Sequence, residues 1–395
     1  MKKPLLVLLV VVLASGAALG RGLTLWTTFG DRTLEWLEDE VASFSATFGV
    51  PVEVTPLGID ELRQRALVGG PKGEAADLFV GVQHDLTADL ALGGVADDVG
   101  AFATAAYLAD LSEQARRAYT FRGRLVGLPM YVEGPALIVN DELVEAVPAS
   151  YEEFVELARE LTTGELAGFM WDAPNFYFSF GWISTFGGYV FGSDASGSLV
   201  PEDVGLDNEG AVRGAQLIKD LRFEYALVPA DVDYGLAAER FTEGSLAMIY
   251  DGPWAIGRYL AAGRSVSVHP MPPLADGTPW SGFMGVHGLL LNPFSPNRTD
   301  AANLGKWLTR PEAQVAMARR AGRIPASIGA LAQVESERLI AGFGLALLDS
   351  VPMPSIPQMS SVWGAMGDAL WDILESPDSD VEETLRRAAD DIRRR

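Results

Sequence analysis

Residues 23–81 alternate between strand-like and helix-like segments, and this alternation restricts the fold more than any other feature. Residues 23–27 (Leu-Thr-Leu-Trp-Thr) are rich in β-branched and aromatic side chains, which is typical of a strand. The segment that follows repeats apolar residues at helical spacing, at Leu34, Leu37, Val41 and Phe44. A second strand, a second helix and a third strand are expected at 49–54, 62–68 and 77–81. A β-α-β-α-β order predicts a parallel sheet with helices on both faces.

The length of 395 residues exceeds what one hydrophobic core normally organises, so we expect two domains. Hydrophobic residues make up 48% and charged residues 21% of the chain, which is typical of a globular protein. The sequence therefore predicts two α/β domains.

Two segments have the character of connections between domains. Residues 127–140 are extended and contain two prolines that exclude a helix, so this segment is expected to leave one sheet and enter another. Residues 266–273 form a strand that runs into a proline-rich stretch, a natural second crossing. We expect one domain to comprise 21–131 plus 284–330 and the other 132–283 plus 331–395.

The stretch 241–254 predicts a helix, a strand and a second helix in close succession. An amphipathic segment ends at Gly244, where glycine can take the left-handed conformation, and 246–250 is an apolar strand. Asp251 is expected to cap the next helix, with Pro253 in its first turn. Trp254 is thereby placed at the carboxyl end of a strand, where open α/β sheets bind ligands.

Other helix boundaries carry local signals. Ser150 and Glu153 form a capping box that opens a helix over 151–161, and Thr309 and Glu312 are expected to do the same for a helix that ends near Gly322.

The first twenty residues have the pattern of a signal peptide. Lys2 and Lys3 precede an uninterrupted apolar run over 5–13, and Ala18-Leu19-Gly20 resembles a cleavage site. An uncleaved membrane anchor is the alternative, but the apolar run is short for the roughly 20 residues that a span requires. We expect export, with cleavage after about Gly20.

Charge and cysteine content exclude several classes of function. The formal net charge of −23 repels phosphate backbones and anionic lipid, so nucleic-acid and membrane-surface roles are disfavoured. The absence of cysteine excludes a thiol nucleophile and the lipid-modified cysteine of a bacterial lipoprotein. Only three histidines occur, widely spaced, so no metal site is expected. We expect a free periplasmic protein without a cofactor.

Aromatic residues concentrate near predicted strand ends and loops. Such rings cover the C–H faces of a sugar, while neighbouring carboxylates and amides bond its hydroxyls. The residues concerned are Tyr177, Phe178, Trp182, Trp254, Trp280 and Trp363. For each one alone, ordinary core packing is the better explanation, whereas several together beside polar residues favour a site.

Catalytic signals are weak. Asp85 and Glu133 are conceivable partners in a glycoside hydrolase pair, but the sequence fixes no distance between them. No Gly-x-Ser-x-Gly elbow stands near a histidine, and Gly69-Gly70 lacks the lysine and hydroxyl of a P-loop.

Several blocks together resemble the periplasmic maltose/maltodextrin-binding proteins of ABC importers. The most specific blocks are 203–208 (Asp-Val-Gly-Leu-Asp-Asn), 233–234 with 247–254 (Ala-Met-Ile-Tyr-Asp-Gly-Pro-Trp), and 356–360 (Ile-Pro-Gln-Met-Ser) with Trp363. The likeness extends over nearly the whole chain after the leader. It implies a two-domain periplasmic binding protein fold of type II, with several chain crossings at the hinge and a cleft that closes on a sugar.

The resemblance also implies roles for individual residues. Asp31 and Arg32 match a hydroxyl-binding aspartate–lysine pair, with arginine in place of lysine. Asp85 and Glu133 match hydroxyl-binding carboxylates. The remaining matches are the stacking aromatics and one pocket residue, namely Tyr177, Trp254, Trp363 and Phe178.

The chain departs from the family pattern at five positions. Val82 replaces a stacking tryptophan, Leu86 an arginine, and Asn175 a glutamate. Gly364 and Gly367 replace a tyrosine and an arginine that follow Trp363. These changes are compatible with a sugar as the ligand but do not indicate which sugar. The two glycines suggest room for a bulkier or branched sugar.

We therefore expect a monomeric sugar-binding protein that delivers an oligosaccharide to membrane permeases and their ATPase, and not an enzyme. One alternative is a binding protein for another solute, such as an amino acid, a polyamine or a metal. The other is a secreted glycosidase. The aromatic and hydroxyl-bonding residues favour a sugar.

Overall fold

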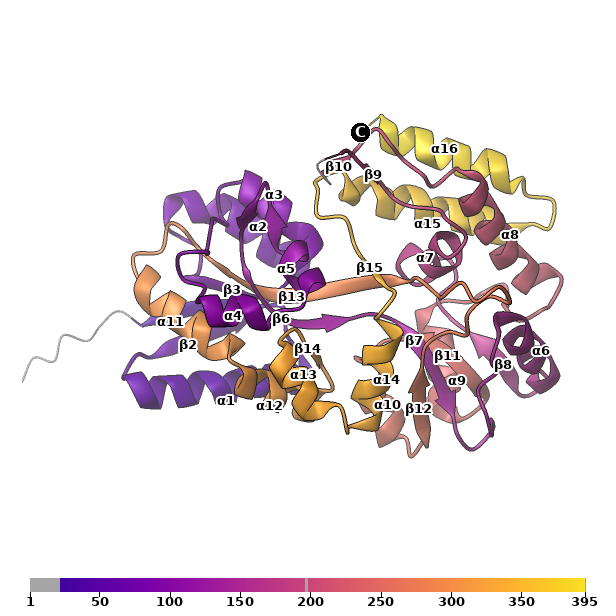
Figure 1. Ribbon diagram of the computed structural model, residues 1–395, viewed down its shortest axis with the longest axis horizontal. Helices are drawn as coiled ribbons and strands as arrows, with labels where there is room; N and C mark the ends of the chain where they lie inside the picture. The colour runs from indigo at the N-terminus through magenta and orange to yellow at the C-terminus, as the bar shows by residue number, and fades with distance from the viewer. Residues whose placement is uncertain (1–21, 196–197, 395) are drawn as a thin grey trace, which may run out of the picture.

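A computed structural model describes residues 22–195 and 198–394, and the leader expected over 1–20 lies outside these ranges. The described chain forms two α/β domains side by side, each built around its own sheet (Figure 1). We call residues 22–133 and 283–334 the first domain and residues 134–282 and 335–394 the second domain.

The sheet of the first domain begins with the predicted parallel unit. Its strands are β1 (Leu23–Thr27), β2 (Val52–Pro56), β3 (Leu78–Gln83), β6 (Leu128–Glu133), β13 (Phe283–Leu291) and β14 (Ile324–Pro325), in the order β14-β6-β13-β3-β1-β2. β1 is parallel to β2 and β3, which confirms the β-α-β-α-β prediction. β13 runs antiparallel to β3 and β6, and β15 (Val351–Pro352) joins its first residues.

Helices pack on this sheet through faces that carry their apolar side chains. α1 (Asp31–Phe48) packs against α11 (Arg298–Thr309) and α12 (Pro311–Ala321). Trp36 of α1 is buried, and its indole Nε1 donates to the carbonyl oxygen of Ala313 at 3.1 Å. The other elements of the domain are α2 (Ile59–Gly69), α3 (Thr87–Leu92), α4 (Ala105–Asp110), α5 (Glu113–Ala118), α13 (Ile328–Val334) and the hairpin of β4 (Thr120–Phe121) and β5 (Arg124–Leu125).

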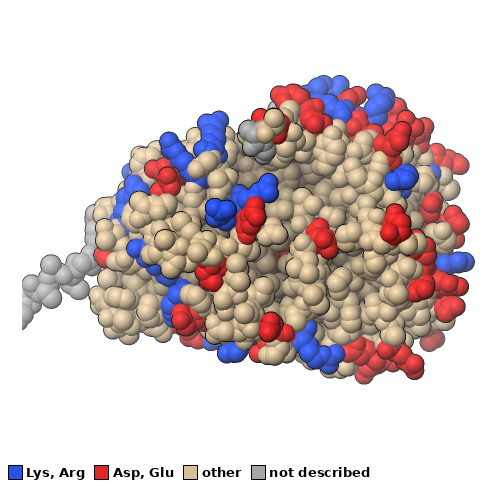
Figure 2. All heavy atoms as spheres, viewed as in Figure 1, with Lys and Arg blue, Asp and Glu red and all other residues tan. Residues whose placement is uncertain are grey.

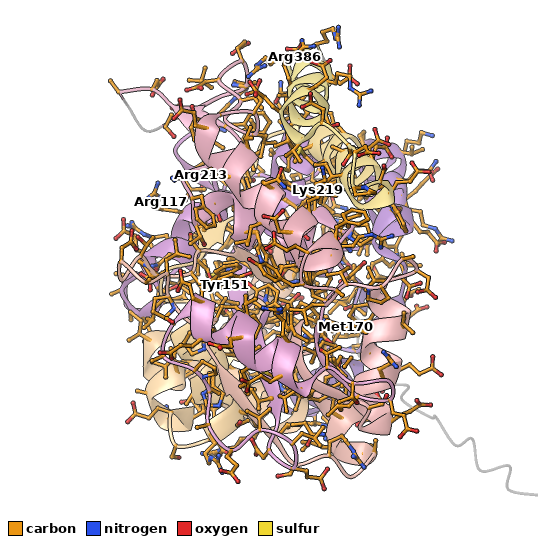
Figure 3. The ribbon with its side chains drawn as sticks, turned by 90° about the vertical axis from the view of Figure 1, so that its right-hand side faces the viewer. Arg117, Tyr151, Met170, Arg213, Lys219 and Arg386 are labelled. Atoms are coloured by element: carbon orange, nitrogen blue, oxygen red, sulfur yellow. The ribbon has the colours of Figure 1, made fainter. Side chains whose placement is uncertain are left out.

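The second domain has a four-stranded sheet in the order β12-β7-β11-β8. Its strands are β7 (Ala136–Asn140), β8 (Ala167–Met170), β11 (Leu246–Asp251) and β12 (Val266–His269), and a small hairpin pairs β9 (Gly192–Ser193) with β10 (Leu199–Val200). Its helices are α6 (Tyr151–Leu161), α7 (Phe176–Ser184), α8 (Glu209–Phe223), α9 (Tyr234–Glu243), α10 (Ile256–Ala261), α14 (Arg338–Ala346), α15 (Met359–Glu375) and α16 (Val381–Arg393). Figure 3 looks onto this domain, with Arg386 marking α16 at its outer edge.

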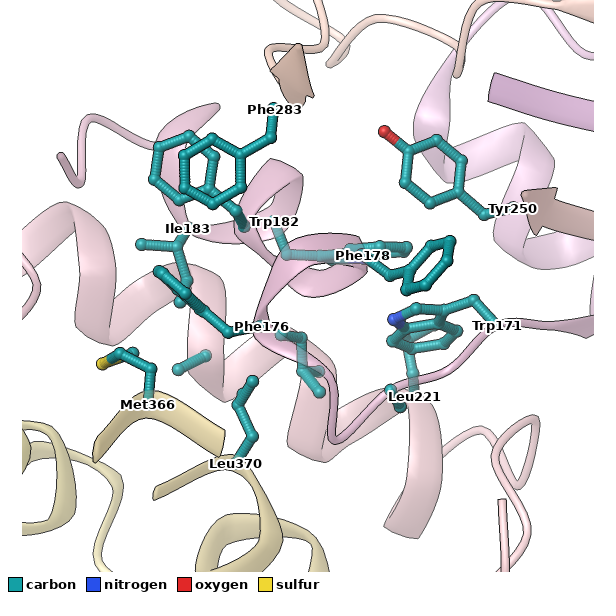
Figure 4. Close-up of a cluster of buried hydrophobic side chains, with 14 of the residues drawn as sticks. Trp171, Phe176, Phe178, Trp182, Ile183, Leu221, Tyr250, Phe283, Met366 and Leu370 are labelled. Atoms are coloured by element: carbon teal, nitrogen blue, oxygen red, sulfur yellow. The ribbon is translucent and has the colours of Figure 1, made fainter. Parts of the chain in front are cut away.

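Aromatic side chains dominate the core of the second domain (Figure 4). The rings of Trp171 and Trp182 are stacked with centroids 4.3 Å apart, and Trp182 Nε1 donates to the hydroxyl of Tyr151 at 2.8 Å. Trp280 is also buried and donates to the hydroxyl of Tyr250. Trp182 and Trp280 therefore serve the core, and only part of the aromatic set is left for a ligand.

The chain crosses between the domains where the sequence predicts it. β6 ends at Glu133 in the first sheet and β7 begins at Ala136 in the second, so the extended segment leaves one sheet and enters another. The return runs from β12 through the proline-rich stretch to β13, which is the predicted second crossing. A further crossing follows α13, because α14 packs on β12.

Three local predictions are wrong. Pro253 does not lie in the first turn of α10, because this helix begins at Ile256. Asp251 does not cap α10: it is buried at the end of β11, accepts from the backbone N–H of Gly252 and the hydroxyl of Tyr259, and leaves the N-cap position to Ala255. Thr309 does not open α12, because its hydroxyl donates back to the carbonyl of Gly305 in α11.

The other helix signals are confirmed. Ser150 caps α6 by accepting from the N–H of Glu153, and Gly244 and Gly322 end their helices in the left-handed conformation, with φ of 83° and 69°.

Acidic residues are unevenly shared between the domains. The first domain contains 14 Lys and Arg against 19 Asp and Glu, and the second contains 12 against 34. The formal charges are therefore −5 and −22, and Figure 2 shows carboxylates gathered over the second domain. Within 22–195 and 198–394, no helix has the length and apolar character needed to cross a membrane.

Candidate ligand site between the domains

A cavity of about 310 Å³ lies where the two domains face each other. Three of its walls are segments that follow strands of the first domain, namely 28–30 after β1, 57–59 after β2, and Gln83 at the end of β3. The opposite side is formed by Trp254 of the second domain. The cavity thus occupies the carboxyl edge of the parallel strands, the usual ligand position in such sheets.

The floor of the cavity is an ionic cluster of Glu133, His287 and Arg323. Glu133 Oε1 lies 2.7 Å from His287 Nε2, and Glu133 Oε2 accepts from Arg323 Nη1 at 2.9 Å. The other ring nitrogen of His287 faces the carbonyl oxygen of Gly81 at 3.3 Å. Tyr131 stacks on His287 with ring centroids 4.6 Å apart, and the guanidinium of Arg323 lies 5.2 Å from the centre of the same tyrosine ring.

The cluster keeps Glu133 ionised. Burial of the side chain opposes ionisation, but attraction to His287 and Arg323 outweighs it and lowers the pKa of Glu133 below its usual value. Both carboxylate oxygens already accept hydrogen bonds from the protein. Glu133 therefore lines the cavity, and it also holds His287 and Arg323 in place at the base of the cavity.

Asp85 offers a carboxylate oxygen without a partner. Its Oδ1 atom is buried and has no hydrogen-bond partner within the described residues. Burial raises the pKa of Asp85 to about 6, and the nearby charge of His287 only partly opposes this. A buried acceptor of this kind needs a donor, although Asp85 is not among the residues that line the cavity.

His84 has a structural role. Its Nε2 atom lies 2.8 Å from the carbonyl oxygen of Met353, and its Nδ1 accepts from the N–H of Val286 at 3.1 Å. These partners require a neutral ring, and burial lowers the pKa of His84 to about 4. In 22–195 and 198–394 no group of three His, Asp or Glu side chains is arranged to hold a metal ion.

Trp254 is held in place by three neighbours. Its Nε1 donates to the hydroxyl of Tyr234 at 3.1 Å, and the rings of Tyr177 and Phe178 lie 6.2 and 6.1 Å from it. The indole folds back over Gly252, where a Cβ atom would come within 2.1 Å of the ring. The structure thus brings together three of the four predicted aromatic residues.

Trp363 extends this aromatic wall. It lies on α15, 5.8 Å from the ring of Phe283 and 6.1 Å from that of Phe176. Phe283 in turn stacks on Tyr177 at 6.2 Å. Trp363 and Trp254 are therefore connected through packed rings, and both are partly exposed.

Asp31 and Arg32 are exposed in the first turn of α1, directly after Gly30, which borders the cavity. Asp31 has a φ of 45°, an unusual value for a residue other than glycine. Asn175 caps α7: its Oδ1 accepts from the N–H of Tyr177 and its Nδ2 donates to Asp172. Both polar atoms of Asn175 are thus already in use.

The positions that depart from the family pattern differ in their surroundings. Val82 is fully buried in the core, and Tyr119 donates its hydroxyl to the carbonyl of Val82. Leu86 is partly buried against the same core. Gly364 is exposed, and a Cβ atom added there would meet no atom within 4 Å; at Gly367 the nearest atom would lie 4.0 Å away.

Sequence reasoning missed His287, Arg323 and Tyr131. A histidine inside the otherwise apolar strand 283–291 was a usable signal, because a buried titratable group needs a partner. Arg323 follows the helix-ending Gly322, but no local pattern shows that it meets Glu133, 190 residues away in sequence.

Comparison with known proteins places the chain in a family. Residues 40–341 match the model of a family described as bacterial extracellular solute-binding proteins. The chain is 42% identical to a maltotriose-binding protein of Thermus thermophilus solved with maltotriose, with a TM-score of 0.86 over 94% of this chain and 99% of that one. A cyclo/maltodextrin-binding protein solved with maltotetraose is 28% identical, with a TM-score of 0.86 and coverage of 94% and 96%.

Relatives compared by sequence include proteins for different oligosaccharides. A galactooligosaccharide-binding protein of Bacillus subtilis (strain 168) is 27% identical over 90% of this chain and 85% of its own length. A maltotriose-binding protein of Pyrococcus abyssi (strain GE5 / Orsay) is 28% identical over 84% and 73%. The two-domain fold and the predicted resemblance are confirmed, and since the matched region runs from α1 to α14, the chain belongs to the bacterial extracellular solute-binding protein family.

Proposed function

We propose that this protein captures a maltooligosaccharide outside the cell and delivers it to the permease and ATPase subunits of an ABC importer. The observation that carries the proposal is the position of Trp254, which faces the polar strand ends of the first domain across one cavity. An indole opposite polar side chains, here Gln83, Glu133 and Arg323, suits a sugar, because its C–H faces are apolar and its edges carry hydroxyls.

The sugar-binding set that we propose comprises Asp31, Arg32, Asp85, Glu133, Asn175, Tyr177, Phe178, Trp254 and Trp363. A ligand that bridges both walls binds the closed arrangement more tightly than the open one, and so shifts the hinge equilibrium by that difference. The predicted domain boundaries, 21–131 plus 284–330 and 132–283 plus 331–395, remain our proposal, and they fall within a few residues of the crossings from β6 to β7, from β12 to β13 and from α13 to α14.

The solved relatives support maltooligosaccharides as the ligand class, since one was solved with maltotriose and another with maltotetraose. The open surroundings of Gly364 and Gly367 support room for a larger or branched sugar beside Trp363. Binding of amino acids or polyamines is the alternative that a ligand screen would reveal.

We also propose that the protein is not an enzyme. A glycosidase needs a carboxylic acid that carries a proton at working pH, and its pKa is therefore raised. The pKa of Glu133 is lowered instead, and both of its oxygens are bonded to the protein. Asp85 has a raised pKa, but its partner Glu133 is bonded to the protein through both oxygens and is not free to act as the second carboxylate that hydrolysis requires.

Export and a free, monomeric state complete the proposal. The expected leader and the absence of cysteine favour a cleaved signal peptide and a periplasmic protein without a lipid anchor. Some relatives, such as a maltooligosaccharide-binding protein of Streptococcus pneumoniae, are lipoproteins, so mass determination of the mature chain tests this point directly.

Isothermal titration of the mature protein with maltotriose tests the ligand. Trp254→Ala should weaken binding by more than about 1 kcal/mol if the indole stacks on the sugar. Trp371→Ala is the matched control, because Trp371 is 51% exposed on α15 and should not affect affinity. Failure of maltotriose and longer maltooligosaccharides to bind, with a thermal shift from an amino acid or polyamine, would overturn the proposal.

A further inference from the structure

We propose that Arg323 is a sugar-binding residue whose guanidinium donates to a ligand hydroxyl from the floor of the cavity. This inference rests on the function proposed above. No pattern in the sequence points to Arg323, whereas its contacts in the folded chain do.

Two donor groups of Arg323 are already occupied and fix the side chain. Nη1 donates to Glu133 Oε2 at 2.9 Å, and Nε donates to the hydroxyl of Thr33 at 3.2 Å. The guanidinium also lies over the ring of Tyr131. An arginine held on three sides loses little further rotamer freedom when it binds a ligand.

The third nitrogen, Nη2, has no partner among residues 22–195 and 198–394. The side chain of Arg323 borders the cavity and is 16% exposed, so it is accessible from the cavity although it is mostly buried. Nη2 therefore carries two donor hydrogens that only water or a ligand can satisfy.

The position of Arg323 also suits a neutral sugar. Glu133 balances the positive charge at close range, and Asp31 adds a further attraction from the start of α1. A charge compensated in this way does not demand an anionic ligand. It gives a charge-assisted hydrogen bond to a hydroxyl oxygen, which is stronger than a bond between neutral groups.

Arg323 further connects separate parts of the first domain. It follows α12, contacts Thr33 in α1 through its side chain, and pairs with the last residue of β6. Since β6 leads directly into the crossing to β7, a ligand held by Arg323 would be anchored beside the hinge.

The test measures maltotriose affinity in Arg323→Lys and Arg323→Gln. Lysine keeps the charge but cannot make the three separate contacts, and glutamine removes the charge. We expect each variant to bind maltotriose about tenfold or more weakly. The matched control is Arg320→Gln, because Arg320 lies three residues earlier and pairs with Asp39 and Glu35 on the surface.

A second measurement distinguishes a direct hydrogen bond between Arg323 and the sugar from an indirect effect of Arg323 through Glu133. Monodeoxy derivatives of maltotriose are titrated into the wild type and into Arg323→Lys, and thermal melts confirm that both are folded. If Arg323 donates to the sugar, removal of one particular hydroxyl weakens binding to the wild type about tenfold but has little effect on the variant. An indirect role predicts the same loss in both proteins for every derivative.

The outcomes distinguish this inference from the proposed function. Wild-type protein that binds no maltooligosaccharide overturns the proposed function, and the inference with it. Wild-type protein that binds maltotriose, together with folded Arg323 variants of unchanged affinity or with uniform losses across the derivatives, overturns only the role of Arg323.

Discussion

The indole of Trp254 lies directly against the backbone of Gly252, so close that a Cβ atom at Gly252 would approach the ring to 2.1 Å. The two residues are separated only by Pro253, and the turn after β11 folds the ring back over its own chain. The indole of Trp254 can therefore occupy this position beside the cavity only because Gly252 has no side chain.

Gly252→Ala should displace the indole, because the ring is confined by Tyr177, Phe178 and Tyr234 and cannot simply move aside. We expect maltotriose affinity to fall about tenfold or more, with a shift in tryptophan fluorescence. Gly257→Ala is the control: nothing lies within 4 Å of the place its Cβ atom would take, and alanine in helix α10 should stabilise the protein by roughly 0.5–1 kcal/mol. Equal affinity in Gly252→Ala and wild type would contradict the fixed position of the ring.

Tyr234→Phe removes the hydrogen bond to Trp254 Nε1 but keeps the ring that stacks on Phe178 at 5.9 Å. The expected loss in binding free energy is about 1 kcal/mol, the usual value for one neutral hydrogen bond. Titration calorimetry of this variant beside Tyr189→Phe measures the loss, since the Tyr189 hydroxyl donates to Asp203 and neither residue lines the cavity. A loss of the same size in Tyr189→Phe would show that the effect is not local.

Asp85→Asn should increase stability while reducing sugar affinity. Because burial raises the pKa of Asp85 to about 6, the ionised carboxylate costs stability in the ligand-free protein at neutral pH, and this cost vanishes below the usual value of 3.8. We expect Asp85→Asn to be more stable than wild type by on the order of 1–2 kcal/mol at pH 7.5 and equal to it near pH 3.5.

The raised pKa of Asp85 also predicts how sugar binding depends on pH. Sugar hydroxyls donate to the ionised carboxylate, so maltotriose affinity of the wild type should fall as the pH decreases through about 6. Asp85→Asn should lack this dependence, whereas Asp368→Asn, an exposed position on α15, should retain it. Calorimetry from pH 5 to 8 gives the answer, and an affinity of the wild type that is constant over this range would refute the prediction.

Glu133→Gln should destabilise the protein by about 3 kcal/mol at pH 7, because it leaves the mostly buried Arg323 without its counter-charge and weakens the hydrogen bond to His287. The pKa of Glu133 is lowered in the folded state, so its contribution to stability is present above the usual value of 4.5 and is lost as the pH falls through the lower folded value. Urea melts at pH 7 and pH 3.5 should therefore show a difference from wild type that shrinks in acid. Glu152→Gln, on the exposed face of α6, should change little at either pH.

Sequence patterns predicted the fold well because its main features are local. The parallel unit of β1, β2 and β3 follows from short-range alternation, and the crossing from β6 to β7 follows from prolines that exclude a helix. The error at Asp251 has a physical cause. The carboxylate is drawn into the core by the hydroxyl of Tyr259, and such a partner cannot be recognised from the residues next to it.

The candidate site could be predicted only in part, for a related reason. Trp254 stands out because it ends a strand, but Trp182 and Trp280 look similar in the sequence and are core residues. The floor cluster joins residues from β6, β13 and the segment after α12, and no local pattern connects these three segments.

The unequal charge of the domains affects how the protein meets its partners. With −22 on one domain and −5 on the other, the molecule has a large electric dipole along the line that joins the two domains. In the field of a charged surface such a dipole turns before contact is made, and the effect weakens as ionic strength rises. Near an anionic bilayer we expect the less acidic first domain to face the membrane. Long-range electrostatics would then orient the protein before it contacts its partner.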